Sequence, residues 1–283
     1  MNSKLLTERL RGGFKPMDSL AVTVGIPFHS NTRLIDLLEA VESIQKQDVK
    51  VQLIHLLQDG EVSSDLEKYA SDLEANYDNV RYSKLKKAGL PTLLNFSIDK
   101  CDTPYYARMD SDDVSFLHRI RTQYEYLESH QEISILGAWA EEFSSEKGMQ
   151  NSILKKTPTD PLEMVEWFHY RNPFIHSTVM FRVSVFKKIG MYRADFKTDQ
   201  DLELWGRAIN HSIGMANISQ ALIYFRTDNM LLKRSKLDAV FRQLKARYTV
   251  PTWSIRLNIL KIFALVFRLT PRIIREVGYK YLR

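Results

Sequence analysis

Short apolar runs rich in β-branched residues alternate with segments of helical periodicity, and this alternation constrains the fold more than any other feature. Ala21–Ile26 and Val51–Leu57 are typical of buried strands, the first ending at Pro27. Between them, residues 33–47 place apolar side chains at helical spacing. Such strand–helix–strand units predict a parallel sheet with helices on both faces. The same patterns predict helices near 64–76, 92–100, 116–129, 160–168, Val183–Ile189 and Gln200–Asn210, and strands at Val80–Ser83, Tyr105–Met109, 133–143, Ile175–Phe181 and Ala221–Phe225.

Acidic residues follow two of these predicted strands. Asp59 lies in the turn Gln58-Asp59-Gly60, and Asp110-Ser111-Asp112-Asp113 follows the strand at Tyr105–Met109. Ligands of parallel α/β sheets bind outside the carboxyl ends of the strands. Both acidic turns are therefore expected at the ligand-binding edge.

The turn ARMDSDDVSFLHR, residues 107–119, has three carboxylates within four positions. Carboxylates this close repel one another unless a cation or hydrogen-bond donors neutralise them. Hard oxygen ligands suit Mg²⁺ or Mn²⁺, which proteins usually hold with one or two carboxylates and the phosphates of a substrate. The alternative is a solvated acidic turn that caps the helix starting near Phe116.

The charge of the chain is divided unevenly. Residues 231–283 contain 13 basic and 2 acidic side chains, a local charge of +11, while the other 230 residues contain 27 basic and 32 acidic ones, a local charge of −5. The net charge of +6 thus belongs to the C-terminal segment. A basic protein of this kind suggests a polyanion, but the acidic body and the lack of a recognised motif argue against nucleic acid.

The basic segment also contains an apolar helical stripe. Within 254–269, Lys261 and Arg268 lie opposite that stripe, and Pro251 and Pro271 bracket it. Such a helix suits the surface of an anionic membrane, and the alternative is that it packs on the catalytic body or on a second subunit. The stripe consists of Ile255, Ile259, Ile262, Val266 and Leu269, and further cations and aromatic residues follow at Arg272, Arg275, Tyr279, Lys280, Tyr281 and Arg283.

Several classes of protein are excluded. Cys101 is the only cysteine, which rules out an intramolecular disulfide framework and a cysteine-rich zinc site. The N-terminal residues lack the apolar core of a signal peptide, and the chain has no run of 18 uncharged apolar residues, so we expect neither standard secretion nor an ordinary membrane-spanning helix.

An ordered series of sequence blocks over roughly 20–228 resembles the family 2 glycosyltransferases of bacterial polysaccharide and lipopolysaccharide gene clusters. The blocks are AVTVGIPFHSN at 21–31, QDG at 58–60, the segment 90–137 around ARMDSDD, NPFIHSTVMFR at 172–182, GMYR at 190–193 and DQDLELWGRA at 199–208. The resemblance implies a GT-A fold, a single α/β domain around a mostly parallel sheet. We expect a lead-in at 1–19, this domain at 20–230 and the basic membrane-associating segment at 231–283.

The resemblance also implies residues of a nucleotide-sugar site. Asp59 matches an aspartate that contacts the uracil, and its alternative is a simple turn residue. Pro27 and His29 match residues that flank the base, although a lone histidine is often structural. Asn95 matches an asparagine beside the nucleotide pocket, with helix capping as the alternative.

Asp110 and Asp112 match the DxD pair of the family. Asp112 is the expected direct ligand of Mn²⁺ or Mg²⁺, Asp110 is expected to contact the ribose or the metal, and Asp113 to support them. Arg108 and Arg119 flank the motif and either contact phosphate or pair with the acidic residues.

His176 occupies a family position near the reaction centre and is a candidate contact of the metal or the diphosphate.

Asp201 matches the general base that deprotonates the acceptor hydroxyl. The family usually has Glu-Asp here, whereas this chain has Gln200-Asp201, so Asp199 is a candidate source of the missing carboxylate. The alternative is that both aspartates simply favour the positive end of a helix. Trp205 is expected in the core or, alternatively, in the wall of the acceptor site.

Together these matches imply an inverting, metal-dependent glycosyltransferase. The expected donor is a UDP-sugar, and family frequency alone favours a galactosyl donor. The expected acceptor is an undecaprenyl-diphosphate-linked saccharide at the cytoplasmic face of the bacterial inner membrane. Two alternatives are a GT-A-like assembly partner that binds nucleotide without turnover, suggested by Gln200, and a nucleotidyltransferase. The latter lacks its Gly-rich phosphate loop, since GIPFHSNT follows the first strand.

Overall fold

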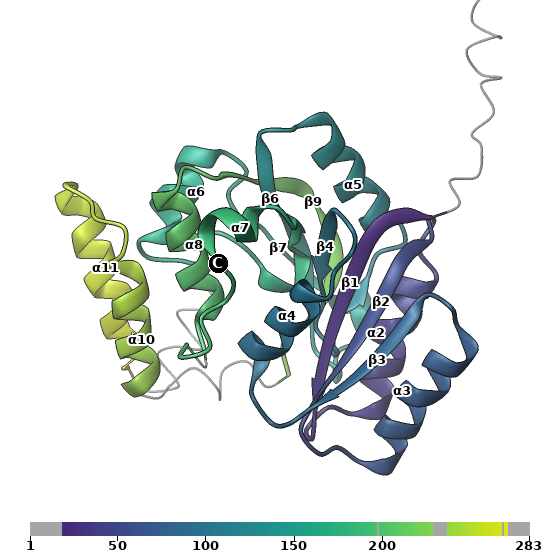
Figure 1. The fold of residues 1–283 in the computed structure, drawn as a ribbon. Helices are drawn as coiled ribbons and strands as arrows, with labels where there is room; N and C mark the ends of the chain where they lie inside the picture. The colour runs from purple at the N-terminus through teal and green to yellow at the C-terminus, as the bar shows by residue number, and fades with distance from the viewer. Residues whose placement is uncertain (1–18, 197, 229–236, 268, 271–283) are drawn as a thin grey trace, which may run out of the picture.

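A computed structural model describes residues 19–196, 198–228, 237–267 and 269–270. In the first half of the chain, strands and helices alternate as expected (Figure 1). They are β1 (Leu20–His29), α2 (Leu34–Gln45), β2 (Val51–Asp59), α3 (Ser64–Asn76), β3 (Val80–Leu85), α4 (Leu90–Asp99), β4 (Tyr105–Arg108), β5 (Val114–Ser115) and α5 (Arg119–Ser129). The second half contains β6 (Ile133–Phe143), η1 (Met149–Asn151), β7 (Ile153–Lys155), α6 (Pro161–Phe168), η2 (His176–Thr178), β8 (Met180–Arg182), α7 (Val185–Ile189), α8 (Gln200–Asn210), β9 (Gly214–Arg226), α10 (Leu237–Arg247) and α11 (Ile255–Phe267).

One sheet runs through the molecule in the order β3-β2-β1-β4-β8-β6-β9-β5, with β7 paired to β6. The four strands β3, β2, β1 and β4 are parallel, as the βαβ pattern predicts. Beyond β4 the sheet is mixed, because β8 is antiparallel to both β4 and β6 while β6 and β9 are parallel. The expected α/β architecture is confirmed.

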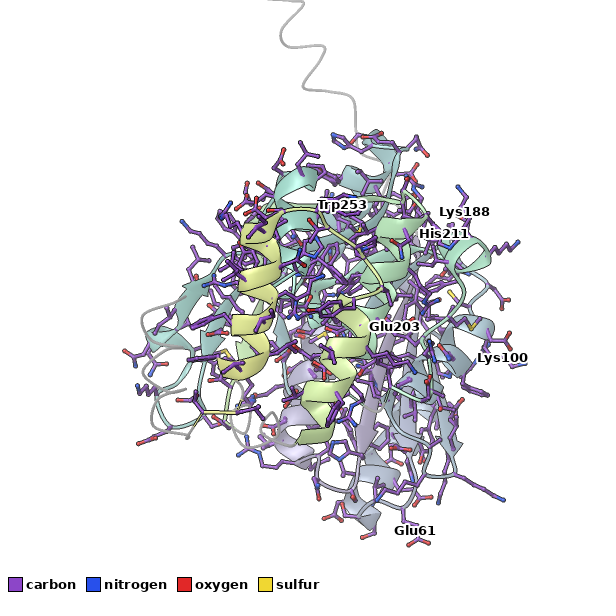
Figure 2. The ribbon with its side chains drawn as sticks, turned by 90° about the vertical axis from the view of Figure 1, so that its left-hand side faces the viewer. Glu61, Lys100, Lys188, Glu203, His211 and Trp253 are labelled. Atoms are coloured by element: carbon purple, nitrogen blue, oxygen red, sulfur yellow. The ribbon has the colours of Figure 1, made fainter. Side chains whose placement is uncertain are left out.

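The two C-terminal helices form a hairpin at the side of the molecule away from β3 (Figure 1). Seen from that side, α10 and α11 lie next to each other, with Trp253 in the segment that connects them (Figure 2). None of the helices in the described ranges is long and apolar enough to cross a membrane.

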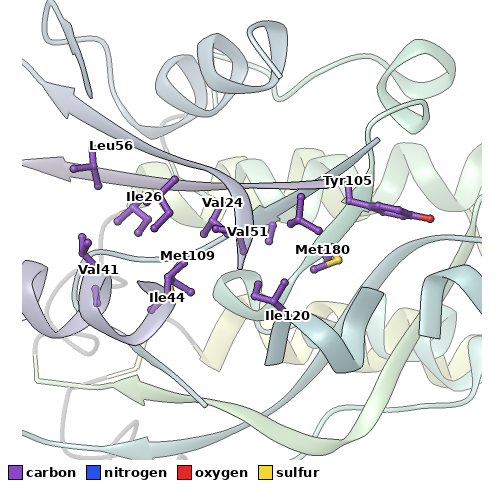
Figure 3. Close-up of a cluster of buried hydrophobic side chains, with 14 of the residues drawn as sticks. Val24, Ile26, Val41, Ile44, Val51, Leu56, Tyr105, Met109, Ile120 and Met180 are labelled. Carbon is purple, nitrogen blue, oxygen red and sulfur yellow. The ribbon is translucent and has the colours of Figure 1, made fainter. Parts of the chain in front are cut away.

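Two clusters of buried side chains cover opposite faces of the sheet. One joins β1, β2 and β4 to α2, α3 and α5 (Figure 3), and the other joins β4 and β8 to α4, α6, α7 and α8. Successive strand residues point to opposite faces, so Tyr105 and Ala107 enter the first cluster and Tyr106 enters the second. Helices therefore cover both faces, and the strand ends remain as the edge on which a ligand can bind.

Two strand predictions in the second half of the chain need correction. The strand predicted at Ile175–Phe181 is wrong in its first part, where η2 forms, and only Met180–Arg182 is extended. Thr178 explains this, because its hydroxyl donates to the carbonyl of Ile175 and accepts from the amide of Ala138, and such local bonds compete with a strand ladder. The predicted strand at Ala221–Phe225 is part of the longer β9, and the sequence patterns missed the short strands β5 and β7.

The first strand does not stop at Pro27 but continues to His29. Arg108, the last residue of β4, lies opposite Gly25, so the residues of β1 that follow pair only with β2. Proline is tolerated where one side of a strand has no hydrogen-bonding neighbour.

Gly25 provides a test of how tightly β1 and β4 pack. A Cβ atom at this position would lie 1.8 Å from the hydroxyl oxygen of Tyr106 and 2.6 Å from the ring carbon that bears it. We expect Gly25→Ala to lower the free energy of unfolding by about 1–3 kcal/mol, because overpacking forces shifts in a buried strand. Urea unfolding measures this loss. Adding Tyr106→Phe removes the closest contact, so the double variant should lose less stability than the two single losses together; additive losses would contradict the proposed clash.

Candidate active site

The acidic turn begins directly after β4, at the carboxyl edge of the sheet. Ligand atoms of Asp110, Asp112 and Asp113 lie within 4.8 Å of one another. Asp112 is exposed, Asp110 is half-buried and Asp113 is buried. The three carboxylates thus form a group that faces solvent through Asp112 and is anchored in the protein through Asp113.

Arg108 is buried and binds Asp110 through two hydrogen bonds, one of them 2.7 Å long. Arg108 therefore pairs with the acidic residues, which is one of the two roles expected for it; the other, a contact with phosphate, stays a prediction. Arg119 is fully buried and donates to the carbonyl of Arg108 and to Gln123, and burial lowers its pKa to about 9. Its guanidinium therefore supports the backbone beneath the turn, and a contact of Arg119 with phosphate stays a prediction.

Arg226, at the end of β9, holds the acidic turn from the other side. Its backbone amide donates to Asp113 over 2.9 Å, its Nε donates to the carbonyl of Asp112 over 2.8 Å, and its Nη2 donates to Glu39 over 2.7 Å. No sequence pattern points to Arg226, since it lies 113 positions from Asp113 and belongs to no local motif.

The chemistry of this donor set fits a divalent cation. Burial raises the pKa of Asp113 well above its usual range, and the negative charges of Asp110 and Asp112 raise it further. The Ser177 hydroxyl and the Arg226 amide oppose this shift only in part. A bound cation would relieve the repulsion among the three carboxylates.

His176 shares a hydrogen bond of 2.8 Å with the hydroxyl of Tyr192. Burial, followed by the positive charge of Arg108, lowers the pKa of His176 well below its usual value, so the imidazole is neutral. A neutral imidazole can accept a hydrogen bond or bind a metal, as expected for this position.

Asn95 holds the backbone of Tyr192 in place. Its side-chain nitrogen donates to the carbonyl of Tyr192 over 2.7 Å, and its oxygen accepts from the amide of Tyr192 over 2.9 Å. Asn95 therefore connects α4 to the loop before α8, and its contact with the nucleotide stays a prediction.

Asp201 lies in the first turn of α8 and accepts a hydrogen bond of 2.6 Å from Asn172. Burial raises its pKa, as does the charge of Asp199, while the Leu202 amide, Asn172 and Arg108 oppose the rise. A carboxylate with a raised pKa that faces a polar site is suited to accept a proton. Asn172 begins the NPFIHST block, but the sequence alone assigned it no role.

The neighbours of Asp201 have different environments. Asp199 is the N-cap of α8, Gln200 is buried at 6% exposure, and Trp205 is fully buried. The Trp205 ring packs against Phe174 and Phe181, with centroids 4.6 and 5.9 Å away. Of the two places expected for Trp205, the structure has it in the core.

The third part of the edge lies between β1, β2 and β3. His29 and Asp59 are register partners at the ends of β1 and β2, whereas Pro27 is buried within β1. Asp59 accepts hydrogen bonds from the amides of Ala88 and Gly89 over 2.7 and 3.2 Å, so it anchors the segment before α4. It also lines a cleft of about 590 Å³, a volume in the range of small-ligand sites. The lining residues are Ser30, Asp59, Gly60, Glu61, Lys84, Leu85, Lys86 and Lys87.

Arg108 connects the acidic turn to the second carboxylate site. It binds Asp110 directly, and its positive charge acts on His176, Tyr192 and Asp201. The fold thus brings together residues that the sequence separates widely. Arg108 contacts Asp110, and its charge influences His176 and Asp201 as well.

Comparisons with known proteins identify the family and the type of fold. Residues 23–190 match the model of the family described as Glycosyl transferase family 2. The chain is 28% identical over 214 residues to an Escherichia coli UDP-Gal:alpha-D-GlcNAc-diphosphoundecaprenol beta-1,3-galactosyltransferase, covering 75% of this chain and 76% of that protein. It is also 28% identical over 214 residues to the amylovoran biosynthesis glycosyltransferase AmsE of Erwinia amylovora, covering 76% and 79% of the two chains.

Among solved structures, residues 1–349 of S. aureus TarS in complex with UDP-GlcNAc align with a TM-score of 0.64 and 15% identity, over 87% of this chain and 72% of that one. This likeness confirms the expected GT-A type of fold. Since the family model matches more than half of the chain, the protein is a glycosyltransferase that belongs to glycosyl transferase family 2.

Proposed function

We propose that this glycosyltransferase moves a sugar from a UDP-sugar to a lipid-linked saccharide, with inversion and with the help of a divalent metal. The observation that carries the proposal is the pair of carboxylate sites around Arg108. One is the exposed group Asp110, Asp112 and Asp113, and the other is Asp201 with its raised pKa. The first suits the diphosphate end of a donor, and the second suits an acceptor hydroxyl.

The cleft beside Asp59 is the proposed site of the uridine. A carboxylate can accept the N–H of a uracil, and the lysines at 84, 86 and 87 favour an anionic ligand. A relative named for UDP-Gal and a structural neighbour solved with UDP-GlcNAc support a uridine donor. Galactose, glucose and their N-acetyl amines all remain candidate sugars.

The proposed metal ligands are Asp112 first and Asp110 second, with His176 as a weaker candidate. When bound, Mn²⁺ or Mg²⁺ would neutralise charge on the departing nucleoside diphosphate. For Asp110 to bind the metal, its carboxylate must share its oxygens between the cation and Arg108. Asp113 and Arg226 keep the turn in place while Asp112 faces solvent.

Asp201 is the proposed general base. It would take the proton of the acceptor hydroxyl as that oxygen attacks the anomeric carbon, and one displacement inverts the configuration there. Gln200, which replaces the usual family glutamate, is a buried neutral amide, and an amide contributes no charge beside the base. Asp199 supplies the neighbouring negative charge instead and raises the pKa of Asp201.

A membrane surface is the proposed location of the acceptor. The apolar stripe of α11 does not pack on the catalytic body: Ile255, Ile259 and Ile262 are 77%, 61% and 54% exposed, and the connecting residue Trp253 is 99% exposed. The expectation that Lys261 forms a cationic surface opposite the stripe is wrong, because Lys261 is buried against α10. Arg268 and residues 271–283 lie outside the described residues, but the net charge of +11 over 231–283 favours an anionic surface. The proposed place is the cytoplasmic face of the bacterial inner membrane.

The metal requirement can be tested by measuring UDP release. EDTA should stop transfer, and Mn²⁺ or Mg²⁺ should restore it. Asp112→Asn should lower the rate by about 100-fold or more, because charge stabilisation by a metal contributes several kcal/mol. The exposed helix residue Asp72 gives a matched control as Asp72→Asn. Full activity in EDTA would refute the role given to Asp112.

The role of Asp201 predicts a loss of rate in one variant and a shifted pH profile in another. Asp201→Asn should lower kcat by about 10²–10⁴-fold, the usual contribution of a general base, while metal-dependent UDP binding by calorimetry stays within about twofold. Asn172→Ala removes a hydrogen bond that lowers the pKa of Asp201, so that pKa should rise further. The base acts when deprotonated, so the acidic limb of kcat/KM should move to higher pH. Asn151→Ala is the control, and a limb that stays in place would contradict the assignment.

Membrane contact can be tested on the exposed face of α11. The double variant Ile259→Gln and Phe263→Gln should bind vesicles of phosphatidylglycerol at least about tenfold more weakly in co-sedimentation, since each buried large apolar side chain contributes about 1.5 kcal/mol or more. Leu162→Gln removes an even more exposed apolar side chain elsewhere and should leave binding unchanged. Unchanged vesicle binding by the double variant would contradict the membrane proposal. So would the finding that the unmodified protein is a dimer and that the double variant is a monomer.

A further inference from the structure

The inner face of α10 carries two buried polar side chains. Gln243 is 3% exposed and Arg247 is 2% exposed, although their neighbours Leu244 and Tyr248 face outward. Glutamine and arginine are seldom buried this completely unless their polar atoms are bonded. Their partners therefore show what this face of the hairpin does.

Gln243 reaches the start of the helix that carries the base. Its Nε2 donates to Asp199 over 2.5 Å. Asp199 is the N-cap of α8 and has a φ of 61°, a left-handed conformation that non-glycine residues rarely adopt without support. Asp201 follows two residues later. The hydrogen bond thus holds the carboxylate of an unusual backbone turn immediately before the base.

Arg247 reaches the segment on the other side of the base. It donates to the carbonyls of Phe168 and Arg171, the second over 3.2 Å, and also to the side-chain oxygen of Gln243. The next residue, Asn172, donates to Asp201. One pair of side chains on α10 therefore holds both the turn that starts α8 and the segment that supplies the hydrogen-bond donor to Asp201.

The hairpin is seated closely enough to act in this way. A Cβ on Gly206 of α8 would lie 2.6 Å from the Thr249 hydroxyl, and Asn210 of α8 donates to the Thr249 carbonyl over 2.9 Å. Lys261 of α11 donates to the carbonyls of Arg247 and Val250 at the end of α10, where a cation is favoured. These contacts connect α11, α10 and α8 in one packed unit.

We infer that Gln243 and Arg247 are positioning residues for Asp201, so that the inner face of the C-terminal hairpin sets the geometry of the base while its outer face is apolar and exposed. This inference depends on the proposed function, because it takes Asp201 as the base. Neither residue touches the reacting atoms; both act through the backbone that carries Asp201 and Asn172.

The test uses Gln243→Met in the full chain, since methionine keeps the volume and removes the amide donor. We expect kcat to fall by about 10- to 100-fold, because a displacement of about 1 Å in a catalytic group has an effect of this size. Metal-dependent UDP binding, measured by calorimetry, should stay within about twofold, as the donor site lies elsewhere. Lys245→Gln, an exposed residue of the same helix, is the control.

A double-mutant cycle separates positioning from general destabilisation. If Gln243 acts through Asp199, the double variant Gln243→Met and Asp199→Gly should be no slower than the slower single variant, since glycine removes the acceptor and tolerates the φ of 61°. Additive losses, an unchanged kcat, or a parallel loss of UDP binding would overturn the inference.

Hydrogen exchange gives a readout that does not need turnover. The amides of 200–203 should exchange faster in Gln243→Met, while those of β1 and β2 should not change. If the unmodified protein transfers no sugar at all, the proposed function fails, and this measurement still decides whether α10 holds the start of α8. Unchanged exchange at 200–203 would overturn the inference on its own.

Discussion

Balancing negative charge at the carboxyl edge of the sheet is the constraint on which the rest of the structure depends. Asp110, Asp112 and Asp113 are crowded after β4, and Asp201 and Asp199 lie nearby at the start of α8. Buried Arg108 binds the first group and its charge reaches the second, while Arg226 ties the acidic turn to the end of β9. Without these cations, burial and mutual repulsion would favour protonation, and the site would lose the charge with which it can bind a metal or accept a proton.

The two-sided core explains why these charges can be held so precisely. β4 has only four residues, all of them buried, and its side chains alternate between the two apolar clusters. A strand that packs against apolar side chains on both faces is held in one position, so the place where it ends is fixed. The acidic turn therefore begins at a defined place, and η2 and β8 bring His176 to the same edge.

The C-terminal hairpin has two faces with different chemistry. Its inner face is polar, buried and bonded to the segments around Asp201, whereas its outer face exposes a row of large apolar side chains. The helix α11, proposed to meet the membrane, packs on α10, and α10 in turn contacts α8, proposed to carry the base. Under this proposal, the helices that bring the enzyme to its membrane acceptor also fix the position of the base.

Local patterns in the sequence were sufficient for the alternation of strands and helices, the acidic turn after β4, and the family blocks that contain Asp59, Asp112, His176 and Asp201. Periodicity and motif spacing act over a few residues, so they can be read without a fold. The bonds from Arg226 to Asp113, from Asn172 to Asp201 and from Gln243 to Asp199 span 113, 29 and 44 positions. No local pattern encodes them, and local patterns also misjudged the end of the first strand at Pro27 and the strand at 175–179. By itself, the sequence determined which carboxylates the site has; only the tertiary structure decided which cations and amides hold them, because those partners meet through packing and not through spacing along the chain.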